Sequence, residues 1–137
     1  MEDSKTLNVI EHEMNYIAVK PLSKNATLPE RKTPGSAGLD LTPCESGTIQ
    51  PGEQALVDTG ISMAIPRGHV GKIEVRSSIA KMMVDVKAGT IDSDYRGSIK
   101  MLLYNYSKHP LDYKAGGKAI AQLVIYLINT DHCQEVE

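Results

Sequence analysis

The amino-acid sequence predicts an all-β protein, built as a barrel or a sandwich with one short helix. Turn signals recur along the chain, and short runs that are β-branched or alternate in polarity lie between them. The chain has 137 residues, which suits one domain of ordinary size. Charged residues make up 23% and apolar residues 41%, so the composition is typical of a globular chain.

The strands are expected between the turn signals. Clear turn signals stand at Pro34-Gly35, Pro51-Gly52, Pro66-Arg67-Gly68 and Gly116-Gly117. The runs that predict strands are 16–22, 55–65, 69–75, 84–91, 98–106 and 120–128.

The remaining segments are expected to be a helix, a loop and two polar ends. Residues 77–83 form the one helix candidate, about two turns long, in which a serine would cap the start. Residues 24–35 are polar, contain two prolines and predict a surface loop. We therefore predict a single domain over 1–137, with a polar N-terminal segment over about 1–15 and a polar C-terminal end from about 129.

The composition limits both the core and the ligands. There are six Tyr, no Phe and no Trp, so we expect an aliphatic core, and any aromatic platform must come from Tyr. The net charge is -2, whereas direct nucleic-acid binding requires a surplus of Lys and Arg. A small anionic ligand bound by a few basic residues remains compatible with this charge.

Cysteine usage and the apolar runs indicate an intracellular protein. Cys44 and Cys133 lie far apart and form no metal-binding spacing, so two free thiols are the simplest expectation. The N-terminus is polar and acidic, which is not typical of a secretion signal. The most apolar run, 119–128, is interrupted by Gln122 and is too short to span a membrane. We expect a cytoplasmic or nuclear protein that is neither secreted nor associated with membranes.

Four short segments could carry chemistry, although each has a structural explanation as well. The carboxylates Asp92 and Asp94 would either satisfy the backbone of a turn or activate a water molecule beside Tyr95. Arg76, followed by two serines, would either be a solvated arginine at a helix cap or bind an anion. Asp40 would be structural or would orient metal-bound water, and Gln122 would face solvent or bind a ligand.

In this order along the chain, the four segments resemble the motifs of the trimeric deoxyuridine triphosphatase (dUTPase) family. The resemblance covers about residues 16–128, and the third motif is the most diagnostic. The matching segments are Ala-Gly-Leu-Asp-Leu at 37–41, Arg-Ser-Ser-Ile-Ala at 76–80, Gly-Thr-Ile-Asp-Ser-Asp-Tyr-Arg-Gly at 89–97 and Ile-Ala-Gln-Leu at 120–123.

The resemblance implies a jelly-roll-like subunit in a homotrimer, with active sites at the subunit boundaries. The implied reaction is hydrolysis of dUTP to dUMP and pyrophosphate, which keeps uracil out of DNA and supplies dUMP for thymidylate synthesis. The implied cofactor is Mg²⁺, held mainly by the substrate triphosphate and water, with no direct protein ligand.

The resemblance also implies roles for individual residues. Asp92 would accept a proton from the attacking water, and Tyr95 would pack under the deoxyribose. The main chain of Gly89, Thr90 and Ile91 would read the uracil ring. The phosphates would be bound by Arg76, Ser77, Ser78 and Gln122, while Asp40 would orient water on the hydrated metal.

One departure from the family motivates an alternative. Thr90 stands where the family usually has an aliphatic residue, which is a tolerable change, but no segment matches the family's fifth motif, a glycine-rich arm near the C-terminus. One alternative is therefore a weakened relative that serves as a protein-interaction module. The other is an enzyme of the dCTP deaminase type, although Asp92 in its Ile-Asp-Ser-Asp-Tyr context favours hydrolysis.

Overall fold

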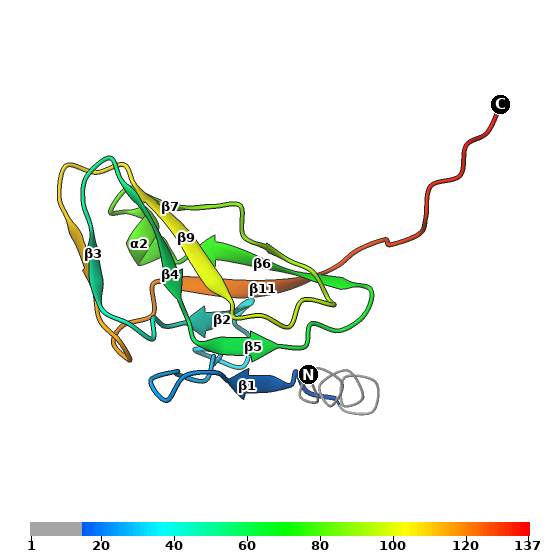
Figure 1. Cartoon of the computed structure of the whole chain (residues 1–137), viewed down its shortest axis with the longest axis horizontal. Helices are drawn as coiled ribbons and strands as arrows, with labels where there is room; N and C mark the ends of the chain where they lie inside the picture. Colours follow the sequence, from blue (N-terminus) through cyan, green and yellow to red (C-terminus); the bar gives the residue numbers. More distant parts are fainter. Residues whose placement is uncertain (1–14) are drawn as a thin grey trace.

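The computed structural model describes residues 15–137, and their regular structure is almost entirely β-strand (Figure 1). This confirms the predicted all-β class. The polar segment expected over about 1–15 lies, except for Asn15, outside the described residues. The elements are β1 (Val19–Pro21), β2 (Gly38–Leu41), β3 (Gly47–Ile49), β4 (Gln54–Asp58), β5 (Ile61–Met63), β6 (His69–Val75), α2 (Ser77–Ala80), β7 (Val84–Lys87), β8 (Thr90–Ile91), β9 (Lys100–Asn105), β10 (Leu111–Tyr113) and β11 (Ala121–Leu127).

The strands form four sheets in which every pair is antiparallel. The largest sheet has the order β2-β11-β6-β8, and the second has the order β4-β9-β7. Two ribbons, β1-β5 and β10-β3, complete the set. Within the described residues the large sheets keep their edge strands, so the arrangement is a sandwich of open sheets and not a closed barrel.

The core is aliphatic and joins the two large sheets. The alternation along β9 places Met101, Leu103 and Asn105 inward, each fully buried. Met101 and Leu103 belong to the same apolar cluster as Leu123 of the four-stranded sheet. The buried Asn105 amide donates to the carbonyls of Ile49 (2.9 Å) and His109 (2.8 Å), so it ties β9 to the ribbon.

Two of the expected strands are each divided by a left-handed backbone position. The run 55–65 forms β4 and β5, which are separated at Gly60 (φ 68°). The run 84–91 forms β7 and β8, which are separated at Ala88 (φ 56°) and Gly89 (φ 90°). Extended backbone cannot continue through such angles. The predicted strand runs do not include β2, β3 or β10, and the last two are three residues long and pair with each other.

The helix is shorter than the expected 77–83, and no serine caps it. It covers a single turn, Ser77–Ala80, and Arg76 holds the N-cap position with an extended backbone and no side-chain capping hydrogen bond. The helix ends at Ala80, and residues 81–83 form a turn that closes at Met83, whose φ of 60° is not helical. Among residues 15–137, no helix has the length and apolar character needed to cross a bilayer.

Candidate functional site

Four of the predicted site residues meet at one end of the four-stranded sheet, and we call them the sheet-end cluster: Asp40, Arg76, Ser77 and Gln122. Asp40 on β2 is the direct ladder partner of Gln122 on β11. Arg76 follows β6, the strand on the other side of β11. A cavity of about 140 Å³ lies here, lined by Lys32, Ser36, Gly38, Asp40, Arg76, Ser77 and Gln122.

The sheet-end cluster holds its arginine from two sides. Arg76 Nε lies 3.4 Å from Asp40 Oδ1, and the two side chains are 20% and 29% exposed. Arg76 Nη1 also donates to the Ala119 carbonyl (3.2 Å), and Gln122 Nε2 donates to the Val75 carbonyl (3.2 Å). A guanidinium has five N–H donors, so an arginine anchored in this way can still bind an anionic ligand.

Gly38 makes room for Gln122 in this cluster. A Cβ atom at position 38 would lie 2.3 Å from Gln122 Oε1 and 2.9 Å from its Cβ. Only a residue without a side chain allows the glutamine to occupy its observed position. The second residue of the glycine-leucine-aspartate segment, Leu39, packs against the core, so the segment serves both the cavity and the fold.

Lys32 and Ser36 also line the sheet-end cavity, and the sequence analysis missed both. Lys32 belongs to the segment 24–35, which was predicted to be a surface loop, and Ser36 is the residue that follows it. Arg31 Nη1 donates to the carbonyls of Ser36 and Ala37, each at 3.1 Å, so the loop folds back over the start of β2. The only sequence signal for Lys32 was that it is a basic residue in the loop before the segment 37–41, which contains Asp40.

A second group of predicted residues lies at the end of β8, and we call it the loop cluster: Thr90, Ile91, Asp92 and Tyr95. Asp92 is exposed directly after β8, and the Tyr95 amide donates to the Asp92 carbonyl (3.1 Å), which closes the turn. Tyr95 is 41% exposed. A cavity of about 170 Å³ is lined by Thr90, Ile91, Asp92, Tyr95, Ser98 and Lys100.

The backbone leading into the loop cluster is held firmly against β6. Gly89 has a φ of 90°, and a Cβ there would lie 3.0 Å from the Ile73 carbonyl oxygen. The Gly89 carbonyl accepts a hydrogen bond from the Ile73 amide (2.8 Å). Lys72 Nζ donates to Thr90 Oγ1 (3.0 Å). Peptide groups fixed in this way have defined directions toward a ligand.

The two clusters stand apart within one chain. Ile91 on β8 is paired with Gly71 on β6. Arg76 lies five residues after Gly71, just beyond the end of β6. At about 3.3 Å per residue, the clusters are separated by about 17 Å along the sheet. Their cavities share no lining residue. Ser78 is exposed on α2 and lines neither cavity.

The acidic residues fit a cation that arrives with its own ligands. Among residues 15–137, no group of three or more His, Cys, Asp and Glu side chains could hold a metal ion. Asp40 is the one carboxylate that lines the sheet-end cavity. A single carboxylate is too little for a protein cage around Mg²⁺, but it suits a hydrated ion that is bound mainly through substrate phosphates.

Comparison with known proteins gives the same family as the motifs. The dUTPase family model matches residues 24–137. A deoxyuridine 5'-triphosphate nucleotidohydrolase of Solanum lycopersicum is 37% identical over 141 residues, which covers 99% of this chain and 83% of the relative.

Solved structures agree with this assignment. A mutant dUTPase from phage phi11 of S. aureus, described with a structural Mg(II) ion, has a TM-score of 0.82 and 27% identity, covering 90% of this chain and 97% of its own. The Staphylococcus bacteriophage 80alpha dUTPase with dUPNHPP has a TM-score of 0.79 and 31% identity, and the match covers 90% of this chain and 89% of the phage chain. The sequence and the fold thus lead to one conclusion: the chain belongs to the dUTPase family.

Proposed function

We propose that this chain hydrolyses dUTP to dUMP and pyrophosphate, with the nucleoside at the loop cluster and the phosphates at the sheet-end cluster. Membership of the dUTPase family supports the reaction. The observation that supports the site is the pairing of an exposed carboxylate and an exposed tyrosine at one cavity, Asp92 and Tyr95. Neither the interaction module nor the deaminase is favoured by any observation.

Asp92 acts as the general base. Its carboxylate accepts a proton from a water molecule while that water's oxygen attacks the α-phosphorus. The bond from the α-phosphorus to the bridging oxygen breaks, and pyrophosphate leaves with the electron pair. The exposure of Asp92 beside the cavity supports this role, because the carboxylate can reach a water there.

Tyr95 and the backbone of β8 select the nucleoside. The Tyr95 ring packs under the deoxyribose, where a 2′-hydroxyl would clash. The peptide groups of Gly89, Thr90 and Ile91 read the uracil edge, and their fixed directions support discrimination against cytosine. Buried polar groups that would lose their partners reject a wrong base steeply.

The sheet-end cluster binds the phosphates. Arg76 and Gln122 donate to phosphate oxygens, together with Ser77 and Ser78. Asp40 binds water on a hydrated Mg²⁺ ion that the triphosphate carries. When bound, this ion offsets phosphate charge and helps to align the α-phosphorus.

The separation of the clusters supports a homotrimer with sites shared between subunits, as in the proposed family reaction. The general base and the phosphate-binding arginine must act on one triphosphate, and about 17 Å along the sheet is too far for that. The loop cluster of one subunit is therefore completed by the sheet-end cluster of another.

The outer face of β4-β9-β7 supports subunit contact, because Leu56 is 56% exposed there beside Leu102. An intracellular location is part of the same proposal.

The experiment is a substrate panel with Mg²⁺ present. We expect pyrophosphate release from dUTP and little from dTTP, dCTP or UTP. Ammonia release from dCTP, measured in parallel, would instead indicate a deaminase. Equal turnover of all four nucleotides would contradict the proposed reading of base and sugar.

A further inference from the structure

We propose that Asp58 is a positioning residue for the loop cluster, acting through Ser98 on Tyr95. The proposal rests on the proposed function, because it concerns how the tyrosine meets the sugar. Asp58 ends β4 and is half-buried. It does not line the cavity of the loop cluster, but its ladder partner, Lys100, does. Asp58 therefore lies directly behind the cavity wall.

A chain of hydrogen bonds leads from Asp58 to the tyrosine. The hydroxyl of Ser98 donates to Asp58 Oδ1 in a short contact. The same carboxylate oxygen accepts from the Gly60 amide (2.8 Å). The backbone carbonyl of Ser98 in turn accepts from the hydroxyl of Tyr95 (2.7 Å). A carboxylate makes stronger hydrogen bonds than a neutral acceptor, so Asp58 holds Ser98 firmly.

The neighbours of Asp58 hold the rest of the same loop. The buried Thr59 hydroxyl donates to the Ile99 carbonyl (2.6 Å), and the buried Ser62 hydroxyl donates to the Arg96 carbonyl (2.8 Å). These bonds fix the backbone on either side of Ser98. Removing the Asp58 side chain would therefore change the orientation of Ser98 and Tyr95 without releasing the whole loop.

The position of the Tyr95 ring depends on these hydrogen bonds, because the hydroxyl end of the ring is held by residues 97 and 98 of the loop. A Cβ at Gly97 would lie 2.5 Å from the Tyr95 hydroxyl oxygen, so the ring end rests against Gly97. The hydroxyl is then fixed by the Ser98 carbonyl. A ring fixed in this way presents one face to the sugar. If Ser98 shifts, the ring gains room to move, and a 2′-hydroxyl is tolerated.

The test compares kcat/KM for dUTP with kcat/KM for UTP. Ser98→Ala removes the hydrogen bond between the Ser98 hydroxyl and Asp58 but leaves the bond from the Gly60 amide to Asp58. Asp58→Ala removes both of these hydrogen bonds. We expect each to lower the dUTP/UTP ratio about tenfold, because small misplacements of positioning groups have effects of this order. The double variant should be no worse than Asp58→Ala alone. Asp58→Asn keeps an acceptor oxygen and should stay within about threefold of the wild type.

Asp112→Ala is the matched control. Asp112 accepts a hydrogen bond from the Thr48 hydroxyl (2.6 Å) on the β10-β3 ribbon, so it has the same kind of bond on another sheet. We expect it to leave the ratio unchanged. An unchanged ratio in both Ser98→Ala and Asp58→Ala, or a double variant that multiplies the two effects, would overturn the proposal.

Failure of the proposed function would look different. In that case the wild-type protein would not hydrolyse dUTP at all. The ratio of the Kd values for dUMP and UMP, measured by calorimetry on the same variants, would then decide the role of Asp58. A rise of that ratio toward one in Ser98→Ala supports the positioning role, and an unchanged ratio contradicts it.

Discussion

The sheet-end cluster and the loop cluster are built by different means. Asp40, Gln122 and Arg76 are placed by the register of β2, β11 and β6. Gln122 donates to the main chain of β6, and Arg76 contacts the Asp40 side chain and the carbonyl of Ala119, just before β11. Tyr95 and Asp92 lie on a loop that is held by residues of β4, β5 and the turn between them. The first cluster is a feature of sheet pairing, and the second depends on a few long-range side-chain bonds.

This difference predicts how each cluster responds to change. A substitution in the sheet-end cluster should remove one donor and leave its neighbours in place, because the ladder fixes them. A substitution among the residues that hold the loop cluster should alter selectivity, because it removes one restraint on Tyr95 while the other bonds keep the loop in place. The following variants test both expectations, beginning with the largest effect.

Asp92→Asn should have the largest effect. The amide has a similar size but cannot accept the proton, so we expect kcat to fall on the order of 10³-fold with KM little changed. Steady-state pyrophosphate release measures this. Asp94→Asn, two residues farther along the exposed loop, is the control and should keep most of the activity. Equal losses in the two variants would contradict the assignment of the base.

Arg76→Ala should have the next largest effect. It removes a charged donor to the phosphates, worth about 3 kcal/mol, so kcat/KM for dUTP should fall on the order of 10²-fold. Arg67→Ala, an exposed arginine before β6, serves as the control. The dUTP/UTP ratio should stay constant in Arg76→Ala, because the sugar is read at the other cluster. A changed ratio would mean that the two clusters are not separate in function.

Gly38→Ala should have a smaller effect that tests the packing of Gln122. The new Cβ would lie 2.3 Å from Gln122 Oε1, so the amide must move, and we expect KM for dUTP to rise about fivefold. In Gly35→Ala the new Cβ meets nothing within 4 Å, which makes it the matched control in the preceding loop. Unchanged KM in Gly38→Ala would remove Gln122 from the phosphate site.

Alkylation of Cys44 reports on the turn between β4 and β5, next to the loop cluster. Of the changes tested, we expect it to lower activity least. The Cys44 amide donates to the Asp58 carbonyl (2.9 Å), and burial, followed by the charges of Asp58 and Glu45, raises the pKa of the Cys44 thiol. A raised pKa means less thiolate at pH 8, so iodoacetamide should label Cys44 slowly, and faster as pH increases.

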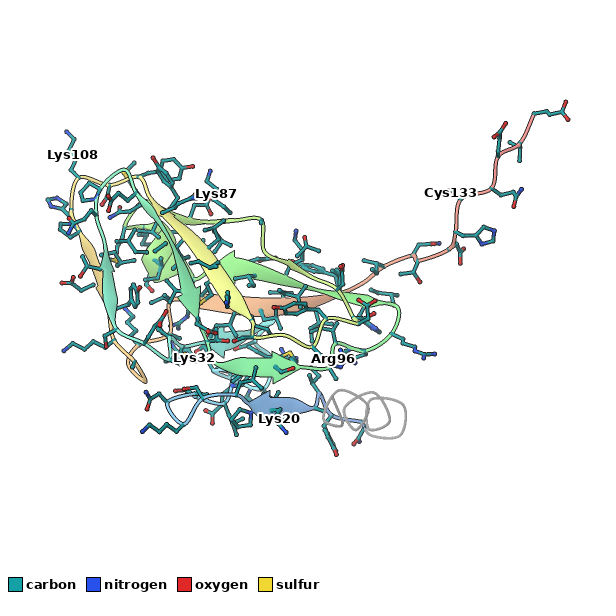
Figure 2. The ribbon with its side chains drawn as sticks, in the orientation of Figure 1. Lys20, Lys32, Lys87, Arg96, Lys108 and Cys133 are labelled. Atoms are coloured by element: carbon teal, nitrogen blue, oxygen red, sulfur yellow. The ribbon has the colours of Figure 1, made fainter. Side chains whose placement is uncertain are left out.

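The other thiol supplies the comparison. Cys133 is exposed on the C-terminal segment, which runs away from the sheets (Figure 2), so it should react about tenfold faster than Cys44 at pH 8. Mass spectrometry of tryptic peptides separates the two sites. Rapid labelling of Cys44 at pH 8 would show that the turn beside Asp58 is open.

Most of the sheet-end cluster could be predicted from the sequence, because its residues lie in short segments that resemble family motifs. Asp92 and Tyr95 were predicted for the same reason. The bond from Ser98 to Asp58 could not be predicted, since the two residues are 40 positions apart and meet only through the register of β4 and β9. Lys32 was missed because a polar loop has no periodic pattern that shows where it folds.

The fold, like the site, could be predicted from the sequence only in part. The runs that became β6, β9 and β11 have clear alternation or β-branched character and were predicted within a few residues. The breaks at Gly60 and Gly89 were missed, because a glycine inside an apolar run does not reveal its φ angle. The short strands β3 and β10 exist only because they pair with each other.

The central claim is that the two clusters of one active site come from different subunits. Co-expression of Asp92→Asn with Arg76→Ala tests it directly, since each variant alone has one defective cluster. If subunits mix at random, half of the loop clusters and half of the sheet-end clusters are intact, so about a quarter of the sites combine two intact clusters. The account predicts recovery of up to about a quarter of wild-type dUTP hydrolysis in the mixed protein. Activity no higher than the mean of the two variants alone would contradict it.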